Sequence, residues 1–202
     1  MLAGKTNPSG RTADTFLTDL TANPTWNNFG NFEYDNVKEF EVDSARGVRF
    51  PHFVNYNEGI YVGYRYYETA ADEGLIDYDS VVQYPFGYGL SYTSFDEKMG
   101  SVAYDTESGT ISFDVTVTNT GDVAGKDVVE VYYNPPYTNG GIEKASANLV
   151  SFEKTKELEP GESETVSIEF DDDDMASYDY RNAKSYVLES GDYRISVRTD
   201  SH

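Results

Sequence analysis

The sequence predicts a mainly β protein whose second half, residues 93–202, forms a two-sheet β-sandwich. Short segments rich in β-branched and aromatic residues recur at regular spacing after about residue 95. Apolar and polar residues alternate within several of these segments, as is typical of half-buried antiparallel strands. Turn sequences rich in Gly, Asn, Asp and Pro separate them. About six or seven strands in this pattern favour two packed sheets with Greek-key connections.

The expected strands of this half differ in how clearly they alternate. Alternation is clearest in residues 111–117, whose apolar side chains fall on every second position. The adjacent pair at residues 128–129, inside the expected strand 127–133, indicates either a β-bulge or a strand buried on both faces. We expect the last two strands to pair as a hairpin. The remaining expected strands are residues 102–104, 149–155, 165–170, 186–188 and 193–198.

The first half of the chain lacks this pattern and is expected to be mostly irregular. Periodicity is weak in residues 17–52, which allow a turn of helix and a short strand at residues 48–50. Residues 60–67 are a strand candidate because they are rich in β-branched and aromatic side chains. Residues 68–79 are expected to form a short helix or a loop, since Gly74 disfavours a long helix.

Residues 53–95 are the most aromatic part of the chain, and glycines interrupt them. Large rings bury much apolar area while their hydroxyls can still meet a partner. Adjacent glycines let two backbones approach closely. The stretch is either a packed junction between two layers or a platform on which a sugar stacks. Its rings are Tyr56, Tyr61, Tyr64, Tyr66, Tyr67, Tyr78, Tyr84, Phe86, Tyr88, Tyr92 and Phe95.

The charge and the missing cysteines exclude several classes of function. The net charge is −21, with 36 acidic and 15 basic residues, which opposes binding to nucleic acid or to an anionic membrane and suits a neutral ligand such as a sugar. Without cysteine there is no disulfide framework or thiol nucleophile. The N-terminus lacks the features of a signal peptide, so we expect a cytoplasmic protein unless the chain is a fragment of a secreted one.

Several segments together resemble family 3 glycoside hydrolases, which are mostly β-glucosidases and related exo-glycosidases. Residues 58–67 (EGIYVGYRYY) and 84–93 (YPFGYGLSYT) resemble the late part of these enzymes. Residues 4–16 (GKTNPSGRTADTF) resemble a slightly earlier segment, except that Thr12-Ala13 replaces the usual Leu-Pro. The sequences around residues 117–129, 158–162 and 190–193 resemble the family's fibronectin type III-like domain. The resemblance covers nearly the whole chain.

The resemblance implies a division into two regions and an incomplete enzyme. Residues 1–92 would be the C-terminal remnant of an α/β sandwich domain with an aromatic linker, and residues 93–202 a fibronectin type III-like, immunoglobulin-like β-sandwich. Family 3 enzymes retain configuration and use two carboxyl groups. The nucleophile belongs to a (β/α)8 barrel domain and the acid/base to a loop upstream of the segment at residues 4–16. We therefore expect no catalytic residue and no cofactor in this chain, and as partners the remaining domains of such an enzyme, in cis or in trans.

Four side chains are candidates for contacting an oligosaccharide. Glu58 lies beside tyrosine and glycine, and a structural bond to backbone or to Arg65 is the commoner use of such a carboxylate. Arg65 lies among tyrosines, where stacking of its guanidinium on rings is the expected role. Trp26 and Tyr137 could stack on sugars from loops, by ring type alone.

No metal site is expected. Residues 171–174 are four consecutive aspartates, which lack the spaced carboxylates of a calcium loop and favour a solvated acidic turn. His52 and His202 are too few and too far apart for a zinc site. Two alternatives stay open: a free-standing carbohydrate-binding or interaction module, and an independent enzyme with an unrecognised pair of carboxyl groups.

Overall fold

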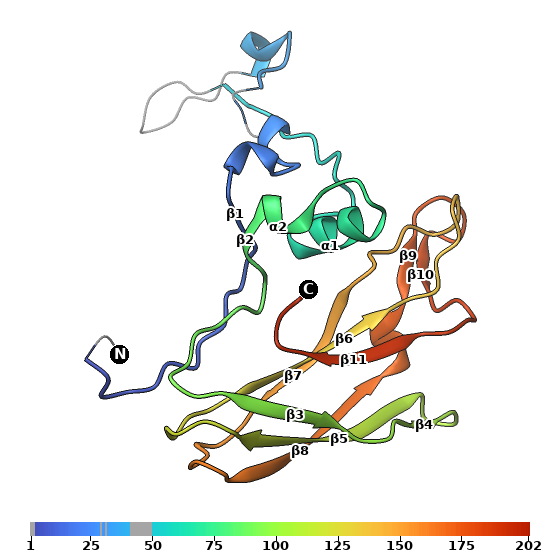
Figure 1. The fold of residues 1–202 in the computed structure, drawn as a ribbon. Coiled ribbons are helices and arrows are strands. Elements are labelled where there is room, and N and C mark those ends of the chain that lie inside the picture. Colours follow the sequence, from blue (N-terminus) through green and yellow to red (C-terminus); the bar gives the residue numbers. More distant parts are fainter. Residues whose placement is uncertain (1–2, 29, 31, 41–49) are drawn as a thin grey trace.

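The protein has two parts, a β-sandwich and an extension built from residues that precede it (Figure 1). The structure is a computed structural model that describes residues 3–28, 30, 32–40 and 50–202. The extension rises from one side of the sandwich, and the C-terminus returns to the place where the two parts meet (Figure 1). The predicted mainly β fold class, a two-sheet sandwich after a mostly irregular region, is confirmed.

The first sheet of the sandwich is built around β5 (Thr110–Asn119). β8 (Ser163–Asp171) pairs along one edge of β5, and both β3 (Phe95–Met99) and β4 (Ala103–Asp105) pair along the other. All these pairings are antiparallel. The predicted alternation is confirmed, because the apolar residues of β5 are buried between polar neighbours that are more exposed. These buried residues are Ile111, Phe113, Val115 and Val117.

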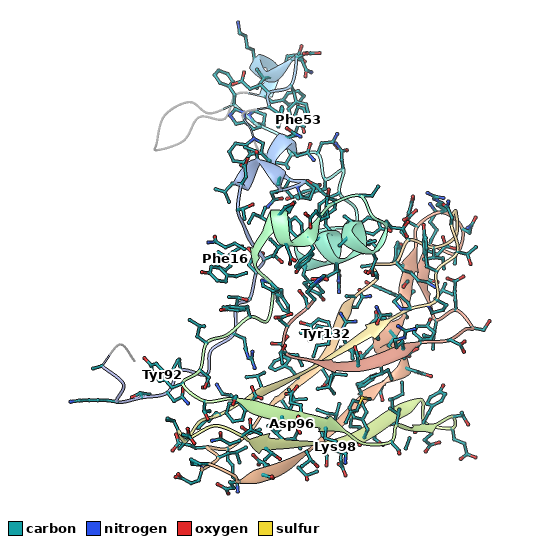
Figure 2. The ribbon with its side chains drawn as sticks, viewed as in Figure 1. Phe16, Phe53, Tyr92, Asp96, Lys98 and Tyr132 are labelled. Carbon is teal, nitrogen blue, oxygen red and sulfur yellow. The ribbon has the colours of Figure 1, made fainter. Side chains whose placement is uncertain are left out.

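The second sheet has β6 (Val128–Asn134) at its centre, between β7 (Asn148–Lys154) and β11 (Arg194–Arg198). Residues 129–133 of β6 are all buried, so burial of both faces, one of the two interpretations of its apolar pair, is correct. The irregularity in pairing lies between Val131 and Tyr132 instead of at residues 128–129. One face of β6 meets the sandwich core, and Tyr132 on the other face meets the extension (Figure 2).

The expected hairpin of residues 186–188 and 193–198 is wrong. β10 (Ser185–Val187) pairs with β9 (Ser177–Asp179), a strand that sequence reasoning missed, and β11 pairs with β6. Ile195 and Val197 of β11 pack on the sandwich core, which draws that strand into the second sheet. The Asp179 carboxylate accepts three backbone N–H groups of the turn between β9 and β10, and this fixes a local hairpin.

The extension contains little regular structure. β1 (Phe16–Leu17) pairs with β2 (Val82–Tyr84), and three 3-10 helices, Leu20–Ala22, Trp26–Asn28 and Val37–Phe40, follow β1. The strand expected at residues 48–50 lies mostly outside the described residues. No helix in the part of the chain that the structure describes is long and apolar enough to cross a membrane.

The strand expected at residues 60–67 is also wrong, because Tyr64 begins helix α1 (Tyr64–Asp72). Tyr67 and Ala70, three positions apart, are buried on one face of this helix, a spacing that only a helix brings together. Burial of that face outweighs the β propensity of the tyrosines. The short helix expected within residues 68–79 is correct, since α1 ends before Gly74 and α2 (Tyr78–Val81) follows.

Candidate functional site

The last residues of the chain fasten helix α1 to the sandwich. Glu68 of α1 is buried, and its Oε1 accepts hydrogen bonds from the Tyr78 hydroxyl at 2.7 Å and the Ser201 hydroxyl at 2.8 Å. Nδ1 of His202 lies 2.9 Å from the other carboxylate oxygen, and the His202 ring stacks on Tyr78 with centroids 3.7 Å apart. The Ser201 N–H also donates to the Phe86 carbonyl at 2.9 Å. The C-terminal residues therefore hold the extension and the sandwich in one arrangement.

Rings of the aromatic stretch complete this junction. Tyr64 stacks on Phe86 with centroids 4.6 Å apart and meets Tyr132 of β6 edge-on at 6.1 Å. The Tyr64 hydroxyl accepts from the Leu149 N–H at 3.0 Å. Edge-on and offset ring pairs add to the stabilisation from burial. These rings form a packed junction, as the first interpretation of the stretch expects.

A second junction is organised by Arg11. Its Nη2 lies 2.6 Å from Oδ1 of the buried Asp127, and its Nη1 donates to the Thr199 carbonyl at 3.0 Å. Nη1 also lies 3.4 Å from the Gly87 carbonyl oxygen. One guanidinium thus binds the aromatic linker, the residue that precedes β6 and the C-terminal segment. The forked arrangement of its N–H groups lets it donate to several acceptors at once.

Two further carboxyl groups lie near this guanidinium. Burial raises the pKa of Glu97 to about 8, and the Asp127 charge adds to the effect while Arg11 opposes it. Burial also raises the pKa of Glu130, whose carboxylate accepts from the Tyr132 hydroxyl at 2.7 Å. One Arg11 cation therefore faces a group of acids that it cannot neutralise fully.

This arrangement predicts that the protein loses stability as the pH rises from 4.5, the ordinary pKa of Glu97, to about 8, its pKa in the folded protein. The folded protein holds the Glu97 proton up to about pH 8, whereas an unfolded chain releases it near its ordinary pKa of 4.5. Stability contributed by the protonated form is thus greatest below pH 4.5 and falls until about pH 8. Glu97→Gln removes this dependence. At pH 8 the free energy of unfolding of the variant should therefore be about 2 kcal/mol higher than that of the wild type.

Urea unfolding from pH 5 to pH 9 checks this prediction. The difference between Glu97→Gln and the wild type should grow with pH and then level off. Asp96→Asn, which changes an exposed carboxyl on the same strand, is the charge-matched control. A difference that is constant with pH, or equal in both variants, would contradict the prediction.

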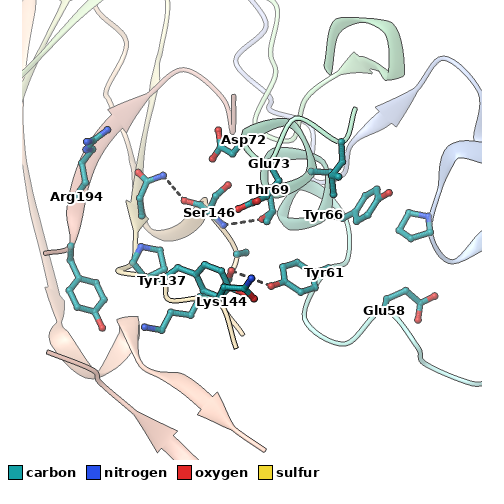
Figure 3. A pocket seen from close by; sticks show the side chains of 18 of the residues that line it. Glu58, Tyr61, Tyr66, Thr69, Asp72, Glu73, Tyr137, Lys144, Ser146 and Arg194 are labelled. Carbon is teal, nitrogen blue, oxygen red and sulfur yellow. Dashed lines mark hydrogen bonds between the residues drawn. The ribbon is translucent and has the colours of Figure 1, made fainter. Parts of the chain in front are cut away.

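A groove of about 980 Å³ opens between α1, the loop after β6 and the start of β11 (Figure 3). Tyrosine rings and polar side chains line it together. In Figure 3, Glu58 and Arg194 lie on opposite sides of the groove, with Tyr61, Tyr137 and Lys144 between them. The volume is at the upper end of about 300–1,000 Å³ for small-molecule sites.

Hydrogen bonds fix the walls of this groove. The Thr69 hydroxyl donates to the Arg65 carbonyl at 2.6 Å and accepts from the Ser146 N–H at 2.9 Å. The Tyr61 hydroxyl donates to Oε2 of Glu143 at 2.8 Å, and burial together with this carboxylate raises the pKa of Tyr61. The buried Lys144 ammonium pairs with Glu189 at 2.5 Å and donates to the Pro136 carbonyl at 2.6 Å. The loop after β6 is therefore held in place against α1.

The structure brings two of the four candidate residues together. Glu58 and Tyr137 line the groove, whereas Trp26 and Arg65 do not. Oε1 of Glu58 accepts from the Asn28 amide at 3.0 Å, which lowers the pKa of Glu58. No ion pair joins Glu58 to Arg65 among the described residues, so that suggested pairing is wrong. Arg65 lies 6.0 Å from the centre of the Tyr64 ring, in agreement with its expected contact with rings.

The acidic run and His52 have local roles. Asp171 and Asp174 cap the 3-10 helix Asp172–Met175, and Asp172 accepts from the Tyr104 hydroxyl at 2.7 Å. His52 lies at an isolated bridge with Glu33. Within the described ranges, no group of three His, Cys, Asp or Glu side chains is placed to hold a metal ion.

Sequence reasoning missed Glu68, Glu97, Asp127 and Glu130, which organise the two junctions. A signal existed for Glu130, because a carboxylate between Val129 and Val131 in an apolar strand requires a buried partner. Glu68 gave none, since two of its partners, Ser201 and His202, lie more than 130 positions away.

Comparison with known proteins places these features in a family. Residues 127–201 match the model of the fibronectin type III-like domain. The chain is 35% identical to β-glucosidase A of Butyrivibrio fibrisolvens over 98% of its own length and 23% of that protein. It is 39% identical to the probable β-glucosidase K of Emericella nidulans over all of its own length and 20% of that protein.

Solved structures agree with this alignment. A β-glucosidase from Paenibacillus barengoltzii superposes on 99% of the chain with a TM-score of 0.79 and 37% identity, and the match covers 19% of that enzyme. The chain thus spans only about a fifth of the length of the proteins that it matches. The sequence, the sandwich and its junction with the extension together identify this chain as matching the C-terminal, fibronectin type III-like part of family 3 glycoside hydrolases of the β-glucosidase group.

Proposed function

We propose that this chain is the non-catalytic, structural C-terminal portion of a β-glucosidase-like family 3 enzyme, and that it packs on the catalytic domains and stabilises them. The observation that carries the proposal is the apolar surface of the extension. Exposed apolar surface that is larger than usual for a free protein marks an interaction site. The large side chains at least half exposed there are Phe16, Leu20, Trp26, Phe40, Tyr56, Leu75, Leu90 and Tyr92.

The backbone of the extension also supports docking. Residues 10–18 run antiparallel to residues 81–89, with hydrogen bonds from the Thr12 N–H to the Tyr88 carbonyl and from the Thr18 N–H to the Val81 carbonyl. A two-stranded ribbon of this length is marginally stable in isolation. A further domain packed against the ribbon would bury Phe16 and Leu90, which line an apolar cleft of about 580 Å³ beside it.

Complementation in trans tests the proposal. β-Glucosidase A of Butyrivibrio fibrisolvens, shortened by the segment that matches this chain, would be mixed with the chain, and hydrolysis of an aryl β-glucoside would be followed. We expect no turnover by the chain alone, and binding to the shortened enzyme with a gain in its activity or thermal stability. Turnover by a single-species preparation of the chain, or no association at all, would refute the structural role.

A matched pair of variants locates the contact. Phe16→Asp places a charge on the exposed apolar surface of the extension and should weaken association at least tenfold. Val102→Asp alters a side chain of similar exposure on the sandwich, far from the ribbon, and should associate like the wild type. Equal effects of the two substitutions would argue against docking through the extension.

The second candidate function is a free-standing carbohydrate-binding or interaction module, and the groove between α1 and β11 favours it. Such a module would gain thermal stability on adding an oligosaccharide, because any ligand of the folded state raises the melting temperature. A purely structural segment would show no such shift.

A further inference from the structure

One asparagine of the chain is followed by a glycine, and it lies on an exposed turn in the loop after β6. Asn139-Gly140 is the only such pair in the sequence. Thr138 to Gly141 form a β-turn, because the Gly141 N–H donates to the Thr138 carbonyl at 2.9 Å. Gly140 has a φ of +83°, the kind of angle that the third residue of a type II turn requires. Asn139 and Gly140 are both exposed, so water reaches the bond between them.

Both groups that react when an asparagine loses its amide are free on this turn. Neither the Asn139 side-chain amide nor the Gly140 backbone N–H has a hydrogen-bond partner in the part of the chain that the structure describes. Since glycine has no side chain, nothing on Gly140 shields its nitrogen. One exposed hydrogen bond closes the turn, and local opening of such a bond costs little free energy. The Gly140 nitrogen can therefore reach Cγ of Asn139.

Asn182 provides a comparison within the same chain. It is also exposed, and a small residue, Ala183, follows it. Its backbone is held, however, because the Asn182 and Ala183 N–H groups donate to the two carboxylate oxygens of Asp179, each at 3.0 Å. The Ala183 nitrogen also carries a neighbouring methyl group. Attack by this nitrogen on the Asn182 side chain would first require both hydrogen bonds to break.

We propose that Asn139 is a site of spontaneous deamidation. The Gly140 nitrogen attacks Cγ of Asn139, so that a bond from this nitrogen to Cγ forms and the bond from Cγ to Nδ2 breaks. Nδ2 leaves as ammonia with the proton of the Gly140 nitrogen. Water then opens the cyclic imide. Addition of water at Cγ gives aspartate, whereas addition at the main-chain carbonyl carbon of Asn139 gives isoaspartate, in which the main chain runs through Cγ.

Either product changes the groove between α1 and β11, because Asn139 is one of the residues that line it. Both products add a carboxylate to a groove that Asp72, Glu73 and Asp192 already line. Isoaspartate also adds a carbon atom to the main chain inside the turn, so the hydrogen bond that closes the turn should be lost. The reaction thus alters the charge of the groove and the shape of one of its walls.

Incubation of the purified chain at pH 8, followed by peptide mapping with mass spectrometry, tests the inference. The fragment that contains Asn139 should gain the mass of an acid in place of an amide. An isoaspartate methyltransferase should methylate part of the product. Asn139 should convert about tenfold faster than Asn182 in the same sample, because the reacting nitrogen is unshielded and free to reach its target.

A matched pair of variants tests the role of the glycine. Gly140→Ala keeps Asn139 but places a methyl group beside the attacking nitrogen, and should slow conversion at Asn139 about tenfold. Gly161→Ala is the control, because Gly161 has a similar φ of +78° in another turn and also has nothing within 4 Å of its ideal Cβ. It should leave conversion at Asn139 unchanged. Melting temperatures of both variants establish that they are folded.

Three results would overturn the inference. The first is equal conversion at Asn139 and Asn182, and the second is conversion in Gly140→Ala at the rate of the wild type. The third is conversion at Asn139 in the urea-unfolded chain but not in the folded chain, because the turn would then protect the asparagine.

Discussion

Gly87→Ala is expected to lower the free energy of unfolding by about 4 kcal/mol, the sum of backbone strain and a steric clash. Gly87 has a φ of +84°, a backbone angle that residues other than glycine rarely adopt. A Cβ there would also fall 2.8 Å from Cδ of Glu130 and closer still to one of its oxygens. Glu130 is buried and held by the Tyr132 hydroxyl, so it cannot move away without losing that bond.

Gly140→Ala separates the two causes. Gly140 has nearly the same φ, +83°, but nothing lies within 4 Å of its ideal Cβ. It should cost only the strain, about 1 kcal/mol. Urea unfolding of both variants measures the difference, which reports the contact with Glu130. Equal losses of unfolding free energy in the two variants would show that the Glu130 side chain moves away from the new Cβ at no cost. The Gly87 carbonyl also accepts from Arg11, so Gly87→Ala should weaken the packing of the extension on the sandwich as well.

Where apolar and polar residues repeat with a single period along a segment, the sequence was sufficient to predict its structure. β5 alternates because one face lies on the core and the other on solvent, and β8 pairs with it along nine residues. The turn at residues 158–162 and the loop after β6 also follow from Gly and Pro alone. Such local chemistry explains why the class of the sandwich was predictable.

Contacts distant in sequence were not predictable. Residues 64–67 have strand propensity, yet the helix there is favoured by burial of Tyr67, which packs with Tyr78 and Val82 of the extension. β11 leaves its neighbour β10 for β6 because its apolar side chains complete the core. In both cases the stabilisation comes from burial against residues that are distant in sequence. The local sequence pattern contains no information about these partners.

The candidate site was predictable only in part, for the same reason. Glu58 and Tyr137 were identified by residue type, and they do lie in one groove. Ser146 carried no signal, since its contact with the Thr69 hydroxyl is made by its backbone N–H. The groove combines α1, the loop after β6 and β11, and only the fold brings these segments together.

Asn119→Asp should destabilise the sandwich by about 3–5 kcal/mol at pH 7, although the two side chains have the same shape. Asn119 is completely buried, and its amide donates to the carbonyls of Val123 and Leu158, each at 2.8 Å. Its Oδ1 accepts from the Thr93 hydroxyl at 2.6 Å and the Gly121 N–H at 3.1 Å. Aspartate would direct a carboxylate oxygen at these two carbonyl oxygens.

The loss should depend on pH with a definite sign. Burial and the facing carbonyls would raise the pKa of the new carboxyl in the folded state above its ordinary value of about 3.9. The variant should therefore be closest to the wild type below that value, where a protonated oxygen can still donate one bond, and should lose stability as the pH rises. Asn139→Asp adds the same charge at an exposed position and should change stability little.

Thermal unfolding at pH 4 and pH 7 measures both variants. Because Asn119 binds the linker through Thr93, the turn through Gly121 and the next strand connection through Leu158, its loss should loosen three segments together. The whole sandwich, including the β6 surface that receives the extension, should then unfold in a single transition at lower temperature. Loss of the turn alone, with an unchanged main transition, would show that these segments are held independently.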